Sequence, residues 1–258
     1  MRTISVITAV HPEKIDHLKA AYESLAAQFL PNGWEWEWLV QQDGLGSEVA
    51  SILPDDRRIK PGSNRHGGPA TARTMALARA TGELVRVLDG DDLLPSGALY
   101  RDIEAITGNA DVCWTTSRVL DLLPDGTTAG FEGDPPPGVI DRGDVYRYWL
   151  AHDFRASVHP ATLCVSTRVL LMLGGWMALP ASEDTGLLLA LNAVSLGYFI
   201  SEPGLLYRKW DGQSTAHAAH VDPEERSARM SVVDLRARTL LDYGGPVRDG
   251  VLTFTDRC

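Results

Sequence analysis

The 258-residue sequence has few cysteines, and they follow no metal-binding pattern. Cys113, Cys164 and Cys258 are odd in number, and their spacing does not fit the paired cysteines of a zinc site. The sequence opens directly on the apolar segment "ISVITAV", without the organisation of a secretory signal peptide. We therefore expect reduced thiols and a cytoplasmic location.

Long apolar runs and clusters of basic residues are also missing. The nearest approach to a membrane span, "VLLMLGGWMALP", is interrupted by two glycines and a proline, and it is shorter than the roughly 18 residues that a span needs. The net charge of −10 disfavours a broad electrostatic contact with nucleic acid or an anionic membrane. We expect a soluble protein with no membrane span and no nucleic-acid partner.

Strand and helix patterns alternate along the first hundred residues. A β-branched strand covers residues 3–10, and an apolar helical spacing follows from Ile15 to Leu25. A second strand ends near Gln42, and its tryptophans predict packing in preference to a sugar-binding platform. "GGPATARTMALARATG" has the early proline and late glycine of a helix, and "ELVRVLD" is a third strand.

This alternation predicts an α/β fold with a right-handed, mainly parallel sheet. Ligands of such sheets bind beyond the carboxyl ends of the strands, where His11, Asp43 and the aspartates of residues 89–92 fall. We also expect a helix opened by Ser182 as its N-cap. The remaining expectations are a strand at 111–123, a turn-rich stretch at 124–138, a short helix at 141–152, a strand at 198–210 and an amphipathic helix at 223–243.

The stretch "ELVRVLDGDDLLPSG" places three aspartates within four positions after an apolar strand. Such carboxylates repel one another unless a cation or several donors lie between them. A calcium EF-hand loop is excluded, because Leu94 and Tyr100 stand where that loop needs glycine and glutamate.

Three interpretations of the cluster stay open. A phosphatase could use the first aspartate as a nucleophile, although that cluster usually follows the first strand of its fold. A nucleotide-sugar site could use Mg²⁺ or Mn²⁺ to bridge the carboxylates and a diphosphate. Finally, Asp89 and Asp92 could merely cap the helix that follows.

Five segments in order resemble the successive blocks of family 2 glycosyltransferases: "ISVITAV", "EWEWLVQQDG", "GGPATARTMALARATGELVRVLDGDDLLPSGAL", "GGW" with "SEDTGLLLAL", and "LLYRKWDGQST". The resemblance covers roughly residues 3–215 and is most specific from Gly68 to Leu99. It implies a GT-A fold, with an open, mixed and mainly parallel sheet flanked by helices. In this interpretation residues 1–99 are the nucleotide-binding half, 100–215 the acceptor half and 216–258 a C-terminal helical extension.

The resemblance assigns a nucleotide-binding role to one group of residues, which consists of Thr8, Ala9, Val10, His11, Asp43, Arg73, Asp89, Gly90, Asp91 and Arg208. Members of the family usually have two aspartates after the second strand, so Gln42 leaves the identity of the base open. Asp91 is implied as a metal ligand, with Asp89 at the ribose or at a metal-bound water. Asp92 is implied to orient the loop or to touch the sugar.

The resemblance also implies the catalytic base and a possible third metal ligand. Asp184 is the implied general base, with Glu183 as its neighbour. Family members commonly carry a histidine where this chain has Trp210, so either His217 or His220 could complete the metal site. Water and diphosphate, or charge neutralisation by Arg208, are the alternatives. His159 could face the acceptor or be an ordinary loop histidine.

The resulting hypothesis is an inverting glycosyltransferase that uses Mn²⁺ or Mg²⁺. It would move a sugar from a nucleoside-diphosphate donor, most simply a UDP-sugar, to a hydroxyl of a small molecule or saccharide. The final helix could pack on its own sheet or on a second copy, which leaves a homodimer open. The alternatives are a metal-dependent nucleotidyltransferase or phosphohydrolase and a non-catalytic nucleotide-sugar binding protein.

Overall fold

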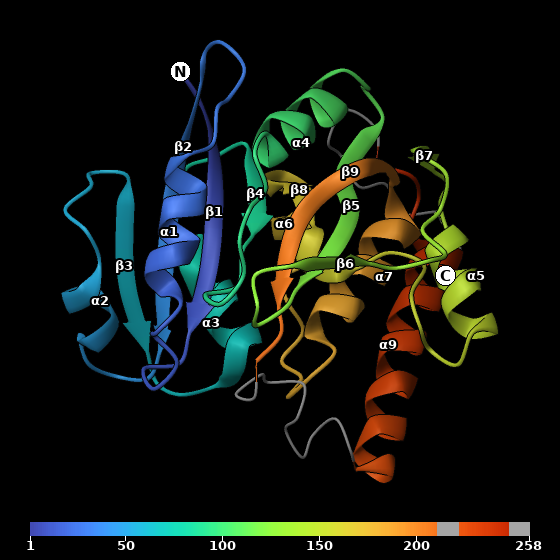
Figure 1. Cartoon of the computed structure of the whole chain (residues 1–258). Coiled ribbons are helices and arrows are strands. Elements are labelled where there is room, and N and C mark those ends of the chain that lie inside the picture. The colour runs from blue at the N-terminus through green and yellow to red at the C-terminus, as the bar shows by residue number, and fades with distance from the viewer. Residues whose placement is uncertain (211–221, 248–258) are drawn as a thin grey trace.

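The computed structural model describes residues 1–210 and 222–247, and its described strands form one nine-stranded sheet (Figure 1). In spatial order the sheet contains β3 (Ile59–Asn64), β2 (Trp34–Asp43), β1 (Arg2–Val10), β4 (Leu84–Val87), β8 (Cys164–Ser166), β5 (Val112–Leu122), β9 (Leu196–Arg208) and β7 (Gly138–Ile140), while β6 (Thr128–Gly130) pairs with β5.

The sheet is mixed and mainly parallel, which confirms the predicted fold class. Parallel pairs join β3 to β2, β2 to β1, β1 to β4 and β5 to β9. The short strand β8 runs antiparallel to both of its neighbours, β4 and β5. Because β8 is reversed, the residues that precede it lie at the edge where β4 ends.

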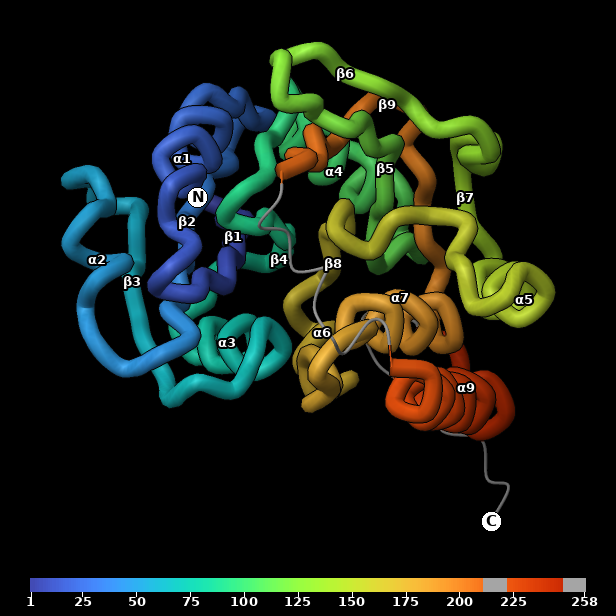
Figure 2. The backbone as a smooth tube through the Cα atoms, turned by 60° about the horizontal axis from the view of Figure 1, so that its bottom comes forward, coloured from blue at the N-terminus to red at the C-terminus, as the bar shows by residue number. Residues whose placement is uncertain are grey.

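Helices cover both faces of the sheet, and each face has its own hydrophobic core (Figure 2). One core contains buried side chains of α1 (Leu18–Ala26) and α4 (Ala98–Thr107), with Val49 from the short helix α2 (Glu48–Ile52). The opposite core contains side chains of α3 (Gly68–Ala76), α5 (Asp144–Ala151), α6 (Thr167–Met172), α7 (Glu183–Val194) and α9 (Pro223–Tyr243). Two single-turn helices, η1 (Leu77–Arg79) and η2 (Pro160–Thr162), complete the described helical segments.

The helix α9 was predicted from its apolar spacing, and the structure places it against α7. Met230, Val233 and Ala237 of α9 are buried in the same core as the apolar residues of α7. The carboxylate of Asp222 caps its first turn by accepting a hydrogen bond from the Glu225 amide at 2.8 Å. The described part of the C-terminal segment therefore shares the core of the sheet.

The tryptophans of β2 serve packing, as predicted. Trp36 and Trp38 are 3% and 0% exposed. The ring of Trp38 stacks on Tyr22 with 5.8 Å between centroids, and its indole Nε1 donates to Thr8 Oγ1 at 2.8 Å. These two side chains have no surface to offer to a sugar.

Several elements differ from the sequence-based prediction. The strands β3 and β8 and the helix α2 were not predicted, and the turn-rich stretch contains β6 and reaches the start of β7. Ser182 does precede α7, but it has a φ of 63° and its side chain makes no capping hydrogen bond. The expectation of a side-chain N-cap was therefore wrong, because a capping serine normally has an extended backbone, whereas that of Ser182 is left-handed.

Within residues 1–210 and 222–247, no helix combines the length and the apolar character that crossing a membrane requires.

Candidate active site

The carboxyl edge of the sheet collects residues from segments that are distant in the sequence. The ends of β1, β2 and β4 bring His11, Asp43 and Asp89 to this edge, and α3 and α7 start beside it (Figure 2). This is the edge at which the order of an open α/β sheet places a ligand.

Arg73 on α3 links the two acidic segments of the site. Its Nη2 donates to Asp89 Oδ1 at 2.6 Å, and its Nη1 donates to Glu183 Oε1 at 2.7 Å. The Arg73 side chain is only 7% exposed. Burial alone would lower the pKa of Arg73, but the Asp89 and Glu183 carboxylates raise it above its ordinary value, so the guanidinium stays charged.

Glu183 and Asp184 are adjacent, yet their environments differ. Glu183 is buried against Arg73, and its pKa is raised by burial and by the charge of Asp184, in opposition to Arg73. Asp184 is only partly buried, and its Oδ1 accepts a hydrogen bond from the Thr185 amide at 2.6 Å. The pair therefore offers one carboxylate fixed by an arginine and one that faces partly toward solvent.

Asp91 and Asp92 contact the chain just after β9. Asp91 Oδ2 accepts a hydrogen bond from Trp210 Nε1 at 2.8 Å. Asp92 is 1% exposed, and its Oδ1 accepts from the Arg208 amide at 2.9 Å. Asp92 therefore links its loop to the end of β9, and its low exposure leaves almost no surface for a ligand.

The electrostatics of this cluster favour a cation. Burial and the charge of Asp89 raise the pKa of Asp91, while the Trp210 hydrogen bond lowers it. Burial and the charges of Asp89 and Asp91 raise the pKa of Asp92 well above its ordinary value. A positive ion beside Asp89 and Asp91 would relieve this repulsion.

The donor set fits a hard divalent cation that is bound partly by the ligand. Asp89 and Asp91 each use one carboxylate oxygen in the contacts above, which leaves a second oxygen for a metal. Across the described ranges, no three His, Cys, Asp or Glu residues are grouped to hold a metal alone. Mg²⁺ commonly uses one or two carboxylates with phosphate and water oxygens, and this set suits that pattern. His217 and His220 lie outside the described residues.

On the nucleotide side, most of the predicted residues at the end of β1 are internal. Thr8 is fully buried; its hydroxyl donates to the Leu88 carbonyl and accepts from Trp38. Val10 is 3% exposed and Ala9 is partly buried. The His11 side chain is 39% exposed, so this histidine has the most surface of the four for a nucleotide.

Asp43 is held by four groups around the start of α3. The Gly67 and Gly68 amides donate to its two oxygens at 2.8 and 2.9 Å, and His66 Nδ1 lies 2.9 Å from Oδ2. Asn64 Nδ2 donates to Oδ1 at 3.3 Å. The His66 ring also meets the His11 ring edge to face, with 5.7 Å between centroids. Sequence reasoning missed His66, whose only signal is its position just before Gly67 and Gly68.

Comparisons with known proteins agree with this geometry. Residues 5–123 match the family model described as glycosyl transferase family 2. This part of the chain is therefore similar to family 2 glycosyltransferases. Asp43, Arg73, Asp89 and Asp91 lie inside the matched segment, whereas Glu183 and Asp184 lie beyond it.

Curated relatives match a shorter stretch. An uncharacterized glycosyltransferase of Rickettsia conorii is 32% identical over 93 residues, which are 35% of this chain and 15% of the relative. A second one, from Rickettsia felis, is 36% identical over 93 residues, with the same shares of the two chains. The match therefore spans less than a sixth of each relative's length.

Solved structures extend the likeness to nearly the whole chain. Residues 1–349 of S. aureus TarS in complex with UDP-GlcNAc give a TM-score of 0.71 at 18% identity, with 93% of this chain and 70% of that chain covered. The same TarS segment in complex with UDP gives a TM-score of 0.65 at 16% identity, with the same coverage. At these identities the likeness shows the fold, a GT-A-like mixed sheet with flanking helices, around the matched segment.

The matched segment also contains Gln42, the departure from the usual pair of aspartates. Gln42 Nε2 donates to Glu48 Oε2 at 2.6 Å, and its Oε1 accepts from the Val49 amide at 2.9 Å. Gln42 is 1% exposed. It therefore anchors the start of α2.

Proposed function

We propose that this chain is an inverting glycosyltransferase that transfers a sugar from a UDP-sugar to an acceptor hydroxyl. The observation that carries the proposal is the Arg73 bridge, which ties Asp89 of the matched segment to Glu183, the neighbour of Asp184. One site at the sheet edge would thereby combine the residues that bind the diphosphate, Asp89 and Asp91, with the general base, Asp184. The likeness to TarS, which was solved with UDP-GlcNAc and with UDP, supports the choice of donor.

The proposed reaction is one displacement. The acceptor oxygen attacks the anomeric carbon, the bond from that carbon to the diphosphate oxygen breaks, and UDP leaves. Asp184 takes the proton of the acceptor hydroxyl, because its carboxylate is partly exposed while Glu183 is held by Arg73. Arg73 stays charged and keeps Asp89 and Glu183 in place.

Asp89 and Asp91 would hold the Mn²⁺ or Mg²⁺ ion, together with diphosphate and water oxygens. When bound, the metal would supply charge stabilisation for the departing diphosphate. The Trp210 indole keeps Asp91 oriented by its hydrogen bond to Oδ2. Asp43 and His11 are the proposed contacts with the uracil base of the UDP-sugar.

The experiment measures the products formed from UDP-GlcNAc, UDP-glucose and UDP-galactose with Mn²⁺. Release of UDP supports glycosyl transfer or its hydrolytic side reaction. Release of UMP together with a sugar 1-phosphate supports the phosphohydrolase alternative, and formation of UTP with a sugar 1-phosphate when pyrophosphate is added supports the nucleotidyltransferase alternative. Binding without any product supports a non-catalytic role.

The base assignment is tested with Asp184→Asn. We expect UDP release to fall by about 10²- to 10⁴-fold, the usual contribution of a general base, while calorimetry shows nearly normal UDP affinity. Asp242→Asn, an exposed position on α9, is the matched control. Normal turnover in Asp184→Asn would exclude Asp184 as the base.

A further inference from the structure

His159 lies at the sheet edge because of the reversed strand β8. It is the N-cap of η2, which leads directly into β8. Because β8 is antiparallel to β4, its first residues lie beside the end of β4, and the Val87 amide donates to the Leu163 carbonyl at 3.1 Å. This places His159 next to the loop that carries Asp89.

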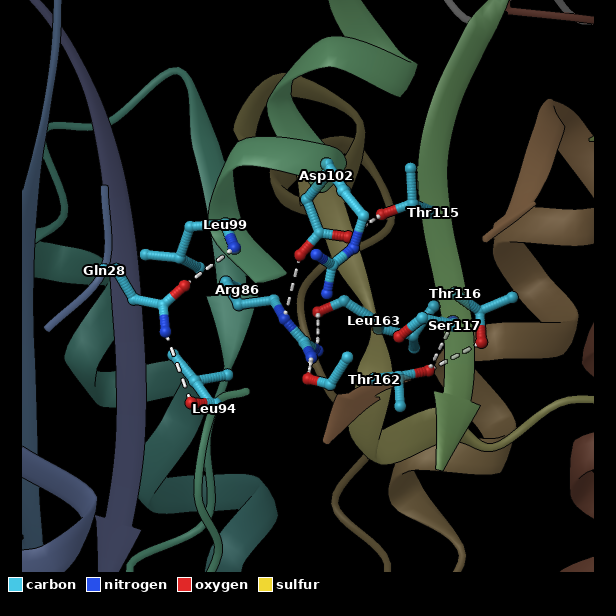
Figure 3. Close-up of polar contacts among 12 residues, drawn as sticks. Gln28, Arg86, Leu94, Leu99, Asp102, Thr115, Thr116, Ser117, Thr162 and Leu163 are labelled. Carbon is cyan, nitrogen blue, oxygen red and sulfur yellow. Dashed lines mark hydrogen bonds and ion pairs between the residues drawn. The ribbon is translucent and has the colours of Figure 1, made fainter. Parts of the chain in front are cut away.

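The backbone that follows His159 is held through Thr162, which contacts Thr116 and Ser117 (Figure 3). Thr162 Oγ1 donates to the His159 carbonyl at 2.7 Å, pairs with Thr116 Oγ1 at 2.6 Å and accepts from the Ser117 amide at 3.1 Å. The buried Arg86 donates to the Ala161 carbonyl at 3.2 Å. Contacts with β4 and β5, at the centre of the sheet, therefore fix the backbone from which the His159 imidazole extends.

The imidazole presents a defined donor to the site. Its Nδ1 accepts a hydrogen bond from the Ala161 amide at 3.3 Å, so in a neutral ring the proton is on Nε2. Burial lowers the pKa of His159, against the carboxylates of Asp184 and Asp89, so the neutral form predominates near pH 7. Nε2 makes no hydrogen bond within residues 1–210 and 222–247.

The surroundings of the ring indicate what it faces. The segment η2, which follows His159 directly, packs against β4, which leads to Asp89, and against α7, which begins at Glu183 and Asp184. The His159 ring also lies 5.4 Å from that of Tyr207, centroid to centroid. His159 thus lies beside the two segments that carry Asp89 and Asp184.

We propose that His159 binds the transferred sugar by donating its Nε2–H to a sugar hydroxyl. In a displacement with inversion, the group between the leaving diphosphate and the base is the sugar, so this inference rests on the proposed function. His159 would then favour UDP-sugars that have a hydroxyl within reach of Nε2. A sugar without that hydroxyl would leave the Nε2–H unpaired in a partly buried site, which carries a free-energy cost.

Two substitutions separate this role from the capping of η2. His159→Asn keeps a side-chain acceptor for the Ala161 amide and removes the Nε2–H donor. His159→Gln places an amide N–H near the position of Nε2. His152→Asn, at an exposed histidine, is the matched control.

The measurement is the ratio of UDP-sugar affinity to UDP affinity, with Mn²⁺, for UDP-GlcNAc, UDP-glucose and UDP-galactose. In His159→Asn we expect UDP affinity within about twofold of the parent. Affinity for the preferred UDP-sugar should fall about tenfold, and the KM for its hydrolysis should rise in parallel. His159→Gln should recover most of the loss, and the melting temperatures of both variants should stay close to that of the parent.

An unchanged ratio in His159→Asn would overturn the inference while leaving the proposed function intact. An equal loss of UDP and UDP-sugar affinity, together with a lowered melting temperature in both variants, would instead assign His159 a purely structural role. If the parent neither binds nor turns over any of the three UDP-sugars, the proposed function fails, and the inference about His159 fails with it.

Discussion

Asp89, Asp91 and Asp92 lie within four residues, yet each has a different environment. Asp89 pairs with Arg73, Asp91 accepts from the Trp210 indole, and Asp92 is buried against the Arg208 amide. An arginine offsets the charge of Asp89, whereas within residues 1–210 and 222–247 the hydrogen bond to the Asp91 carboxylate comes from a neutral indole. A metal ion would therefore stabilise the charged form of Asp91 more than that of Asp89.

We predict that Asp91→Ala weakens Mn²⁺-dependent UDP binding by at least about tenfold, because one of two protein ligands is lost. Calorimetry with and without Mn²⁺ measures the effect. Glu104→Ala, at an exposed residue of α4, serves as the control. If Mn²⁺-dependent binding is the same in Asp91→Ala and the parent, Asp91 is not a ligand.

Glu37 on β2 is a buried carboxylate whose pKa is lowered, whereas the pKa values of Asp91 and Asp92 are raised. It accepts from Ser5 Oγ at 2.6 Å and from the Thr81 amide at 2.6 Å, and it pairs with Lys60. Burial alone would raise the pKa of Glu37, but these contacts lower it overall. The folded state therefore holds fewer protons on Glu37 than the unfolded state, in which the pKa is about 4.3.

The stabilisation from Glu37 is present above the unfolded pKa and is lost as the pH falls through the lower folded pKa. We predict that Glu37→Gln lowers the free energy of unfolding by about 2 kcal/mol at pH 7. The difference from the parent should shrink steadily below about pH 4. Urea unfolding at several pH values measures it, with Glu35→Gln on the same strand as the control; a difference independent of pH would contradict the prediction.

Among the secondary-structure elements, long and regular segments could be predicted and short ones could not. The strand β2 and the helix α9 are 10 and 21 residues long, enough for the tryptophan–glutamate alternation at the start of β2 and the apolar spacing of α9 to be recognised. The strand β3 reads "IKPGSN", with a proline and a glycine that favour a turn, and β8 has three residues. Both exist because neighbouring strands pair with them.

The same limit applied to the site. The resemblance to family 2 glycosyltransferases implied roles for Asp89, Arg73 and Glu183 in one site, and in the structure Arg73 contacts both carboxylates. The contact of Trp210 with Asp91 and the position of His159 depend on how β9 and β8 are threaded through the sheet. No local pattern encodes pairings between segments so far apart in the chain, so these contacts could not be predicted.

At the scale of the whole molecule, a buried ion pair joins the strand β4 to the helix α4 (Figure 3). Arg86 on β4 is 0% exposed, and its Nε lies 3.1 Å from Asp102 Oδ2 on α4. Arg86 Nη2 donates to the Gly204 carbonyl of β9 at 2.9 Å, and Asp102 Oδ1 accepts from Thr115 Oγ1 of β5 at 2.7 Å. One side chain thus connects β4, α4 and β9, and it also supports the segment that carries His159.

We predict that Arg86→Met lowers the free energy of unfolding by about 3–5 kcal/mol, because it leaves the Asp102 carboxylate buried without its partner. The double variant Arg86→Met with Asp102→Leu should recover a large part of the loss, since an apolar pair carries no uncompensated charge. Urea unfolding measures both, with Arg57→Met, at an exposed arginine, as the control. Equal destabilisation in the single and double variants would instead assign the effect to the hydrogen bonds that Arg86 donates to the backbone. The contact of Arg86 with β9 would then contribute more to the free energy of unfolding than its contact with α4.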